Sequence, residues 1–206
     1  MNIIADERTV FTSPDASCVF CYTPALCHGL NGRLVASFDL GGTGVGALPG
    51  PRTTLYGDWS AGNQLRTLVS DDHGATWRET ARLAMFHALL FQDNGVIYLL
   101  GTDGRLVISA SRDNGETFSA PSVIEGSRRW EQGGGRMDFH NGRITLCYEY
   151  SLENNTWPDV GLCLLSAKSG DDLTRPEAWS FSEPFDPRPL VANAASSIGI
   201  PFFTSG

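Results

Sequence analysis

Residues 70–77 read SDDHGATW, and residues 111–118 read SRDNGETF. Both octapeptides fit the template Ser-x-Asp-x-Gly-x-Thr-aromatic, and each lies between two segments typical of β-strands. In such a turn the aspartate accepts hydrogen bonds from backbone N–H groups two residues on, and the glycine adopts the positive φ that the turn needs. The aromatic residue then anchors the next strand in the core. The repeated turn therefore predicts a fold that builds the same hairpin more than once.

Each of these turns occupies the same place in a larger unit. Two apolar runs joined by an Asn-Gly or Asp-Gly turn come first, a third run leads into the octapeptide, and a fourth follows it. Four strands per unit, repeated every 40–50 residues or so, are typical of a propeller blade. We therefore predict an all-β fold, a β-propeller of four-stranded antiparallel blades. The predicted units are blade 1 at about 17–83, blade 2 at about 84–125, blade 3 at about 131–185, and the start of a fourth blade at about 190–206.

Composition narrows the range of partners. The chain of 206 residues is 41% hydrophobic, which suffices for a sizeable core, and its net charge is −8. This acidity argues against nucleic acid or an anionic membrane as a partner. No apolar run approaches the roughly 20 residues of a membrane helix, and MNIIADERTVFTSPD at the N-terminus lacks the features of a signal peptide. We expect a cytoplasmic protein or one whose leader has been removed.

The chain has five cysteines, an odd number in mostly apolar contexts, which argues against a disulfide framework. Cys18-x-x-Cys21 invites a metal or redox interpretation. That interpretation needs a second pair of ligands or a helix N-terminus, and neither is visible in the sequence. We expect buried free thiols on strands, with no metal ion and no cofactor.

The repeated box and the order of the predicted strands resemble the sialidase-like (BNR-repeat) β-propellers over most of the chain. Residues 22–39, YTPALCHGLNGRLVASFD, are similar to the first blade of that family, whose innermost strand opens with Tyr/Phe-Arg-Ile-Pro-Ala-Leu. The resemblance implies six blades and a glycoside hydrolase that removes a terminal acidic sugar, such as sialic acid, from a glycan. The box also occurs in non-catalytic secreted modules, so it indicates the fold more than the function.

In a propeller of this kind the boxes mark one face, and the long loops at 40–63 and 151–159 lie on the other. Carboxylates, imidazole, guanidinium groups and aromatic rings at that second rim suit a glycan partner. Each also has a structural interpretation: the acids cap loop amides, the histidine is buried, and the arginines form a solvated link. The predicted catalytic residues are Asp58, Asp39 and His87, and the predicted substrate-binding residues are Glu149, Arg128, Arg129, Trp130, Glu131, Trp59 and Tyr22.

Two departures from the family leave the activity open. The family's first carboxylate-binding arginine corresponds to Tyr22 or Thr23, where no arginine stands. The resemblance implies that Asp58 is the acid/base residue and that the tyrosine nucleophile and the other arginines come from later blades. We therefore expect the N-terminal part of a longer enzyme, with open sheet edges through which it could associate. The alternatives are a propeller hydrolase or lyase for another uronic or deoxy sugar, with His87 as acid or base, and a non-catalytic glycan-binding or scaffold propeller.

Overall fold

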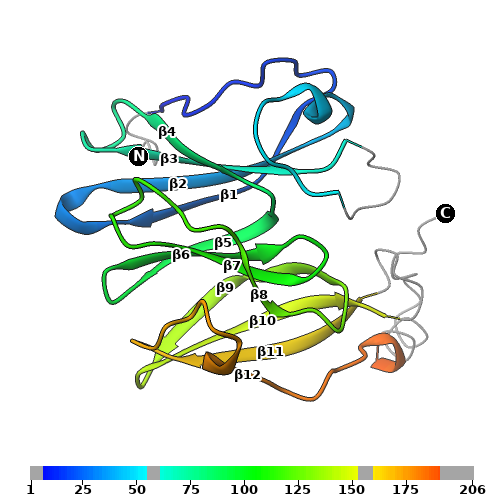
Figure 1. Ribbon diagram of the computed structural model, residues 1–206. Coiled ribbons are helices and arrows are strands. Elements are labelled where there is room, and N and C mark those ends of the chain that lie inside the picture. The colour runs from blue at the N-terminus through cyan, green and yellow to red at the C-terminus, as the bar shows by residue number, and fades with distance from the viewer. Residues whose placement is uncertain (1–6, 55–60, 153–159, 191–206) are drawn as a thin grey trace, which may run out of the picture.

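A computed structural model of the protein describes residues 7–54, 61–152 and 160–190. These segments form three four-stranded antiparallel sheets, in each of which neighbouring strands follow one another along the chain (Figure 1). The predicted all-β class and the four-stranded units are thereby confirmed. Sheet 1 contains β1 (Phe20–His28), β2 (Leu34–Gly41), β3 (Gln64–Ser70) and β4 (Arg78–Leu83). Sheet 2 contains β5 (Phe86–Asp93), β6 (Val96–Thr102), β7 (Leu106–Ser111) and β8 (Ser122–Glu125). Sheet 3 contains β9 (Trp130–His140), β10 (Arg143–Ser151), β11 (Val160–Lys168) and β12 (Trp179–Phe181).

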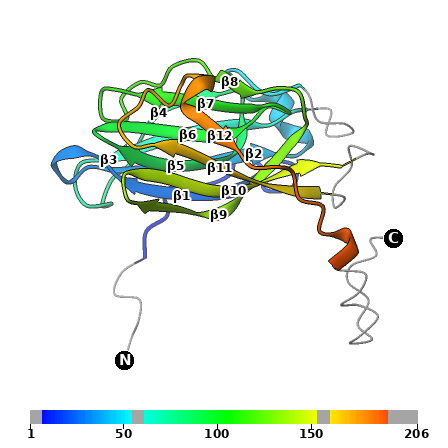
Figure 2. The same cartoon turned by 90° about the horizontal axis from the view of Figure 1, so that it is seen from below.

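The first strand of each sheet lies innermost. Strands β1, β5 and β9 lie toward one side of the molecule, whereas β4 and β8 lie toward the opposite side (Figure 2). Three short 3-10 helices lie in the connections: η1 (Leu30–Gly32), η2 (Thr43–Ala47) and η3 (Pro176–Ala178). The beginnings of the innermost strands and the loops after the second strands therefore meet at one end of the three sheets, and the hairpin turns meet at the other.

Asn-Gly pairs form the turn between the first and second strands of every sheet. Both residues of each pair have positive φ, as type I′ turns require. Asparagine and glycine tolerate this conformation better than other residues, which explains why the sequence predicted these hairpins correctly. The pairs are Asn31-Gly32, Asn94-Gly95 and Asn141-Gly142.

The two octapeptides form the turns between the third and fourth strands of sheets 1 and 2, as predicted. Asp72 Oδ1 accepts a hydrogen bond from Thr76 N at 2.8 Å, and Asp72 Oδ2 accepts one from the Thr76 hydroxyl at 2.6 Å. The donor N–H thus lies four residues on, not the expected two, because His73 and Gly74 both adopt positive φ and turn the chain back. The hydrogen bonds from the Thr76 hydroxyl and N–H lower the pKa of Asp72 to about 2.

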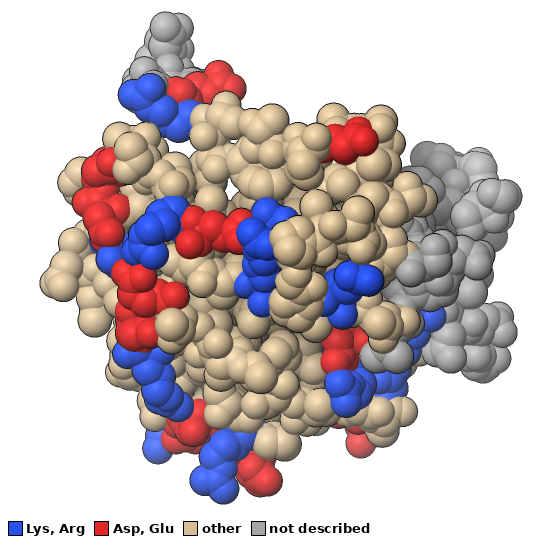
Figure 3. Space-filling model, turned by 45° about the horizontal axis from the view of Figure 1, so that its top comes forward, with Lys and Arg blue, Asp and Glu red and all other residues tan. Residues whose placement is uncertain are grey.

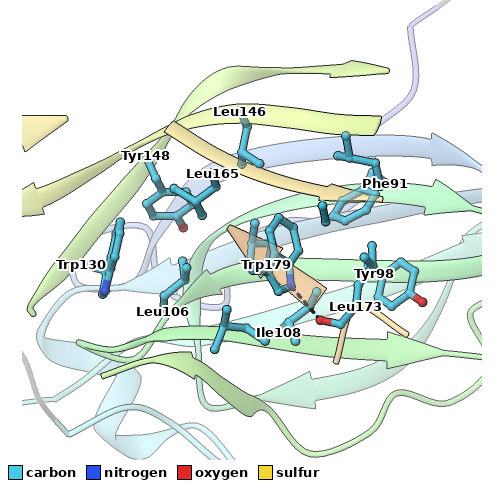
Figure 4. Close-up of a cluster of buried hydrophobic side chains, with 14 of the residues drawn as sticks. Phe91, Tyr98, Leu106, Ile108, Trp130, Leu146, Tyr148, Leu165, Leu173 and Trp179 are labelled. Atoms are coloured by element: carbon cyan, nitrogen blue, oxygen red, sulfur yellow. Dashed lines mark hydrogen bonds between the residues drawn. The ribbon is translucent and has the colours of Figure 1, made fainter. Parts of the chain in front are cut away.

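Buried side chains fill the spaces between the sheets. Between sheets 1 and 2, Val35 packs in one cluster with Leu99. Between sheets 2 and 3, a larger cluster includes Trp130 and Trp179, and the Trp179 indole donates to the carbonyl of Leu173 at 2.9 Å (Figure 4). The octapeptide aromatics contribute as expected, because Trp77 and Phe118 pack against the clusters on either side of sheet 1.

The cysteines are all free, but the expectation that they are buried is wrong for most of them. Only Cys163 is buried, and Cys21 is exposed. Cys21 belongs to β1, whose side chains are mostly exposed or only partly covered. Cys18 precedes that strand, and Cys27 and Cys147 are partly buried.

Gly115, in the second octapeptide, has no room for a methyl group. Its φ is +87°, and an added Cβ would lie 3.1 Å from Val35 Cγ2 and 3.2 Å from Val69 Cγ1, both in the core of sheet 1. Gly95 is a matched control, since its φ is +83° and an added Cβ would meet nothing within 4 Å. We predict that Gly115→Ala lowers the free energy of unfolding by about 1–3 kcal/mol more than Gly95→Ala does. Urea denaturation checks this, and equal losses would show that the octapeptide does not pack tightly on sheet 1.

Candidate active site

His87 occupies an unusual backbone position in β5. Its φ is +50°, and the pairing register between β5 and β6 shifts between Phe86 and Leu89, which marks a β-bulge. Thr23 has φ +45° at the corresponding bulge in β1. The other non-glycine residues with positive φ in the described chain lie in turns. Strained positions inside strands are characteristic of functional sites, so the bulge singles out His87.

Three polar contacts hold the His87 residue, and they come from both neighbouring sheets. The carboxylate of Asp39 on β2 accepts the His87 N–H at 2.5 Å, and the hydroxyl of Tyr148 on β10 donates to the His87 carbonyl at 3.3 Å. The imidazole Nδ1 lies 3.4 Å from the carbonyl oxygen of Glu131 on β9. His87 is therefore the point where all three sheets are joined by hydrogen bonds.

Asp39 lies behind the rim and not on it, which corrects the expectation that it is an accessible catalytic acid. Its side chain is fully buried, and its Oδ1 atom has no hydrogen-bond partner among the described residues. Burial raises the pKa of Asp39 to about 8, although the hydrogen bond from the His87 N–H opposes the rise. At neutral pH Asp39 is therefore largely protonated, and its side chain contacts the backbone of His87.

The His87 side chain has the properties of a general base. Burial lowers its pKa below the usual 6.5, with the Glu131 carbonyl opposing the change, so the ring is neutral at pH 7. A proton on Nδ1 satisfies the Glu131 carbonyl and leaves the lone pair on Nε2. The His87 residue is only partly covered, whereas Asp39 is fully buried.

The predicted rim residues of sheet 3 form a network among themselves. The Glu131 carboxylate is buried, accepts a hydrogen bond from the Ser151 hydroxyl, and lies 3.3 Å from Arg129 Nε. The guanidinium group of Arg128 lies over the ring of Tyr150, 5.4 Å from its centroid. The structure thus brings the Glu131 backbone carbonyl next to the His87 ring, and the Glu131 carboxylate matches the charge of Arg129.

Trp130 is a core residue, so the expectation that it stacks on a sugar is wrong. Its side chain is fully buried in the cluster between sheets 2 and 3, where the rings of Tyr148, Tyr150 and Phe181 surround it. The indole N–H donates to the carboxylate of Glu125. The alternation of β9 explains this position, because Trp130 faces sheet 2 while Glu131 faces the other way.

Of the remaining predicted residues, Tyr22 and Glu149 lie in strands beside this site. Tyr22 is half-buried and pairs with Asp39 across the β1–β2 ladder, one residue before the Thr23 bulge. Glu149 lies on the face of sheet 3 that points away from sheet 2. Asp58 and Trp59 lie outside the described residues. Sequence reasoning missed Tyr148, whose apolar context gave no sign that its hydroxyl reaches His87.

The opposite end of the sheets, where the hairpin turns lie, carries paired charges. His28, His73 and His140 are exposed there, and Arg33 binds both Asp71 and Glu116. Figure 3 shows Lys and Arg interleaved with Asp and Glu over the visible face. A hollow of about 300 Å³ also lies at this end, lined by Asp93, Asn94, Val96, Tyr98, Arg112, Gly170, Asp171 and Asp172. Asp93 and His87 lie at opposite ends of β5, roughly 20 Å apart along the strand, so this hollow is separate from the His87 site.

Clusters of metal ligands and membrane-spanning helices are both absent from the residues that the structure describes. In the ranges 7–54, 61–152 and 160–190, no group of three or more His, Cys, Asp or Glu side chains is placed to hold a metal ion. Within the same ranges, no helix has the length and apolar character needed to cross a membrane.

No family model matches the sequence, and no curated protein matches it. The structure is similar to the α-L-arabinofuranosidase of Lactobacillus brevis, with a TM-score of 0.58 and 18% identity over 86% of this chain and 60% of that one. For the catalytic domain of an α-L-arabinofuranosidase from Coprinopsis cinerea, the TM-score is 0.53 and the identity 13%, over 85% of this chain and 53% of that one. For an ulvan lyase, the TM-score is 0.50 and the identity 18%, over 70% of this chain and 38% of that one.

These similar structures are β-propellers, and the predicted propeller fold is confirmed, with about three blades in this chain. At these identities the likeness concerns the fold. The chain spans 60% or less of the length of each of these three proteins. The more specific likeness to sialidases stays a prediction.

The buried carboxyl of Asp39 makes stability depend on pH. Its pKa is higher in the folded state than in the unfolded chain, so its contribution is full below about pH 4 and is lost as the pH rises toward 8. Asp39→Asn keeps an acceptor for the His87 N–H but does not ionise. We predict that the variant gains stability over the wild type between pH 5 and pH 8, by at most about 1.4 kcal/mol per pH unit. Urea unfolding at several pH values measures this difference, and parallel curves would mean that Asp39 is ionised throughout.

Proposed function

We propose that this chain forms part of a propeller glycoside hydrolase that removes a terminal sugar from a glycan, with His87 as an acid–base group. The observation that supports the proposal most directly is the position of His87. A neutral imidazole stands on a left-handed bulge that both neighbouring sheets hold by hydrogen bonds. Such a scaffold keeps a general base in place without movement during the reaction.

In the proposed reaction, His87 Nε2 accepts a proton from the attacking water, and a carboxylic acid protonates the leaving glycosidic oxygen. Asp39 is protonated at neutral pH, but its burial prevents contact with a substrate. Asp58, which the resemblance to sialidases suggested as the acid, stays the candidate for that role. A tyrosine nucleophile, as sialidases use, would have to come from elsewhere in the propeller.

Two classes of terminal sugar are the first to test. An acidic sugar such as sialic acid would use Arg128 and Arg129 at the rim, although Arg129 already pairs with Glu131. α-L-Arabinofuranosides are suggested by the names of two of the similar proteins. The missing arginine at Tyr22 or Thr23 favours the neutral sugar, because a carboxylate clamp needs a planar bidentate donor.

A lyase that acts on a uronic sugar is a second candidate, because a neutral His87 would serve as the base in that reaction as well. In that reaction the imidazole removes the proton beside the sugar carboxylate, the bond from the sugar ring to the glycosidic oxygen breaks, and that oxygen leaves with a proton from an acid. The product therefore carries a carbon–carbon double bond. Ultraviolet absorbance of this product distinguishes the lyase from a hydrolase.

His87→Asn tests the catalytic role without disturbing the backbone, because asparagine tolerates positive φ. We predict that kcat on the active substrate falls by about 10²–10⁴-fold, the usual contribution of a general acid or base. His73→Asn is the matched control: His73 also has positive φ, at 59°, but lies in the octapeptide turn at the opposite end. The assay uses aryl sialosides, aryl α-L-arabinofuranosides and uronic acid polysaccharides.

Wild-type turnover in the His87→Asn variant would reject its catalytic role. Binding on a glycan array without turnover of any substrate would instead support the non-catalytic glycan-binding alternative. Neither binding nor turnover would reject a glycan function altogether.

The pH dependence of activity gives an independent check. Since burial holds the pKa of His87 below 6.5, the base is already deprotonated at neutral pH. We predict that kcat/KM rises with pH on the acidic side, with a midpoint below 6.5, and that His87→Asn removes this limb from the residual activity. A midpoint well above 6.5 would assign the limb to another group.

A further inference from the structure

The three Asn-Gly turns set a common register for the second strands of the sheets. The seventh residue after each turn glycine is Asp39 in β2, Thr102 in β6 and Glu149 in β10. All three are polar residues in otherwise largely apolar strands. Because the strands start from the same kind of turn, these positions are structurally equivalent in the three sheets.

The side of the strand to which these residues belong faces the following sheet. Val35, on the same side of β2 as Asp39, packs against Leu99 of sheet 2. Leu100, on the same side of β6 as Thr102, packs in the cluster with Leu146 of sheet 3. By the same alternation, Glu149 faces away from sheet 2, toward the position where a fourth sheet would continue the series.

In the first two sheets the equivalent residue bonds to the backbone of the next innermost strand. Asp39 Oδ2 accepts from the N–H of His87 at 2.5 Å, and the Thr102 hydroxyl donates to the carbonyl of Trp130 at 2.9 Å. His87 and Trp130 both lie near the start of their strand, where the register shifts. The residue at this register position thus makes an inter-sheet hydrogen bond in both sheets.

Glu149 occupies this register position in the third sheet, where the described residues include no following sheet. Its Oε2 atom is buried without a hydrogen-bond partner among them. Burial raises the pKa of Glu149, and the nearby Glu131 carboxylate adds to the rise, while a hydrogen bond from the Gln132 side chain opposes it. A buried carboxylate oxygen without a donor is costly, so a donor is expected at this place.

The surface around Glu149 is partly apolar. Leu162 and Leu164 pair with Glu149 and Cys147 across the β10–β11 ladder and therefore share their face. Leu164 is 53% exposed, and Phe185, which pairs with Leu162, is 46% exposed. By contrast, the outward face of sheet 1 is covered, because Val10 and Phe11 pack on Phe38 and Leu40. The outer face of sheet 3 is therefore the end of the stack suited to a further sheet.

We propose that the outer face of sheet 3 binds the innermost strand of a fourth sheet, supplied by this same chain after Leu190, and that Glu149 accepts a backbone N–H from that strand. This assignment extends to the third sheet the hydrogen bond that Asp39 and Thr102 make in the first two. It gives Glu149 a role in assembling the propeller, in place of the substrate-binding role expected from the sequence.

Cys147 reports whether this face is covered, since it lies two residues from Glu149 on the same side of β10. The experiment measures, by mass spectrometry of the full 206-residue chain, the rates at which iodoacetamide alkylates Cys147 and the exposed Cys21 under native conditions. We predict that Cys147 reacts at least tenfold more slowly than Cys21. We also predict that Glu149→Ala raises the alkylation rate of Cys147 several-fold and leaves that of Cys21 unchanged.

Two further variants separate docking from other effects. Glu149→Gln keeps an acceptor oxygen, and we predict that Cys147 is still alkylated slowly in this variant. If Glu149→Gln and Glu149→Ala raise the alkylation rate of Cys147 equally, the charge of Glu149 controls the reactivity of the thiol and the proposal is overturned. Leu164→Gln, at an exposed position where the fold tolerates change, is predicted to speed Cys147 by weakening the apolar contact. Buried Cys163 must stay unreacted in every variant, which confirms that the sheets remain folded.

Other results would also overturn the proposal. Equal rates at Cys147 and Cys21 in the wild type would show that the face is uncovered. A Cys147 rate that falls as protein concentration rises would show that a second copy of the chain covers the face, and not the residues after Leu190.

Discussion

The hydrogen bond between the buried carboxyl of Asp39 and the N–H of His87 is the contact on which the candidate site depends. It joins sheet 1 to the innermost strand of sheet 2 at a residue whose backbone is held at positive φ. Tyr148 secures the other side of the same residue from sheet 3. A left-handed histidine inside a strand costs on the order of 1–3 kcal/mol, and it persists because both neighbouring sheets hold it.

The outer hairpins make this arrangement possible. Each octapeptide satisfies its own backbone through the aspartate and threonine, so the third and fourth strands need little help from neighbouring sheets. The octapeptide of sheet 2 also contacts sheet 1, because Asn114 accepts from Leu30 N and Arg33 binds Glu116. The turn end is therefore held both by bonds within each octapeptide and by contacts between sheets 1 and 2, and the other end carries the strained bulges and the partly exposed titratable groups.

Asp39, Thr102 and Glu149 occupy equivalent positions in the three sheets, yet the contacts at these positions differ from sheet to sheet. In sheets 1 and 2 the seventh residue after the turn glycine faces the next sheet, and the residues at this position differ in charge and hydrogen-bonding capacity. In sheet 1 it holds a histidine in place, and in sheet 2 it binds a carbonyl. One structural position thus serves both assembly of the sheets and construction of the site.

The fold was predictable because its signals are local. Asn-Gly pairs and the Ser-x-Asp-x-Gly-x-Thr-aromatic template encode turns through the φ preferences and side-chain hydrogen bonds of a few adjacent residues, and alternation encodes the strands between them. Such signals also placed His87 and Glu131 at the correct end of the sheets. They could not distinguish the exposed from the buried residues there, so Trp130 and Asp39 were both assigned to the rim.

That distinction depends on which side of each strand meets a neighbouring sheet, and on where a bulge shifts the alternation. The shift at His87 is stabilised by Asp39 and Tyr148, which lie 48 and 61 residues away in the chain. No preference of adjacent residues encodes such a contact. The chain therefore specifies its hairpins and their order through local chemistry, whereas the depth of each polar side chain, its pKa and its access to a ligand arise only where three sheets come together.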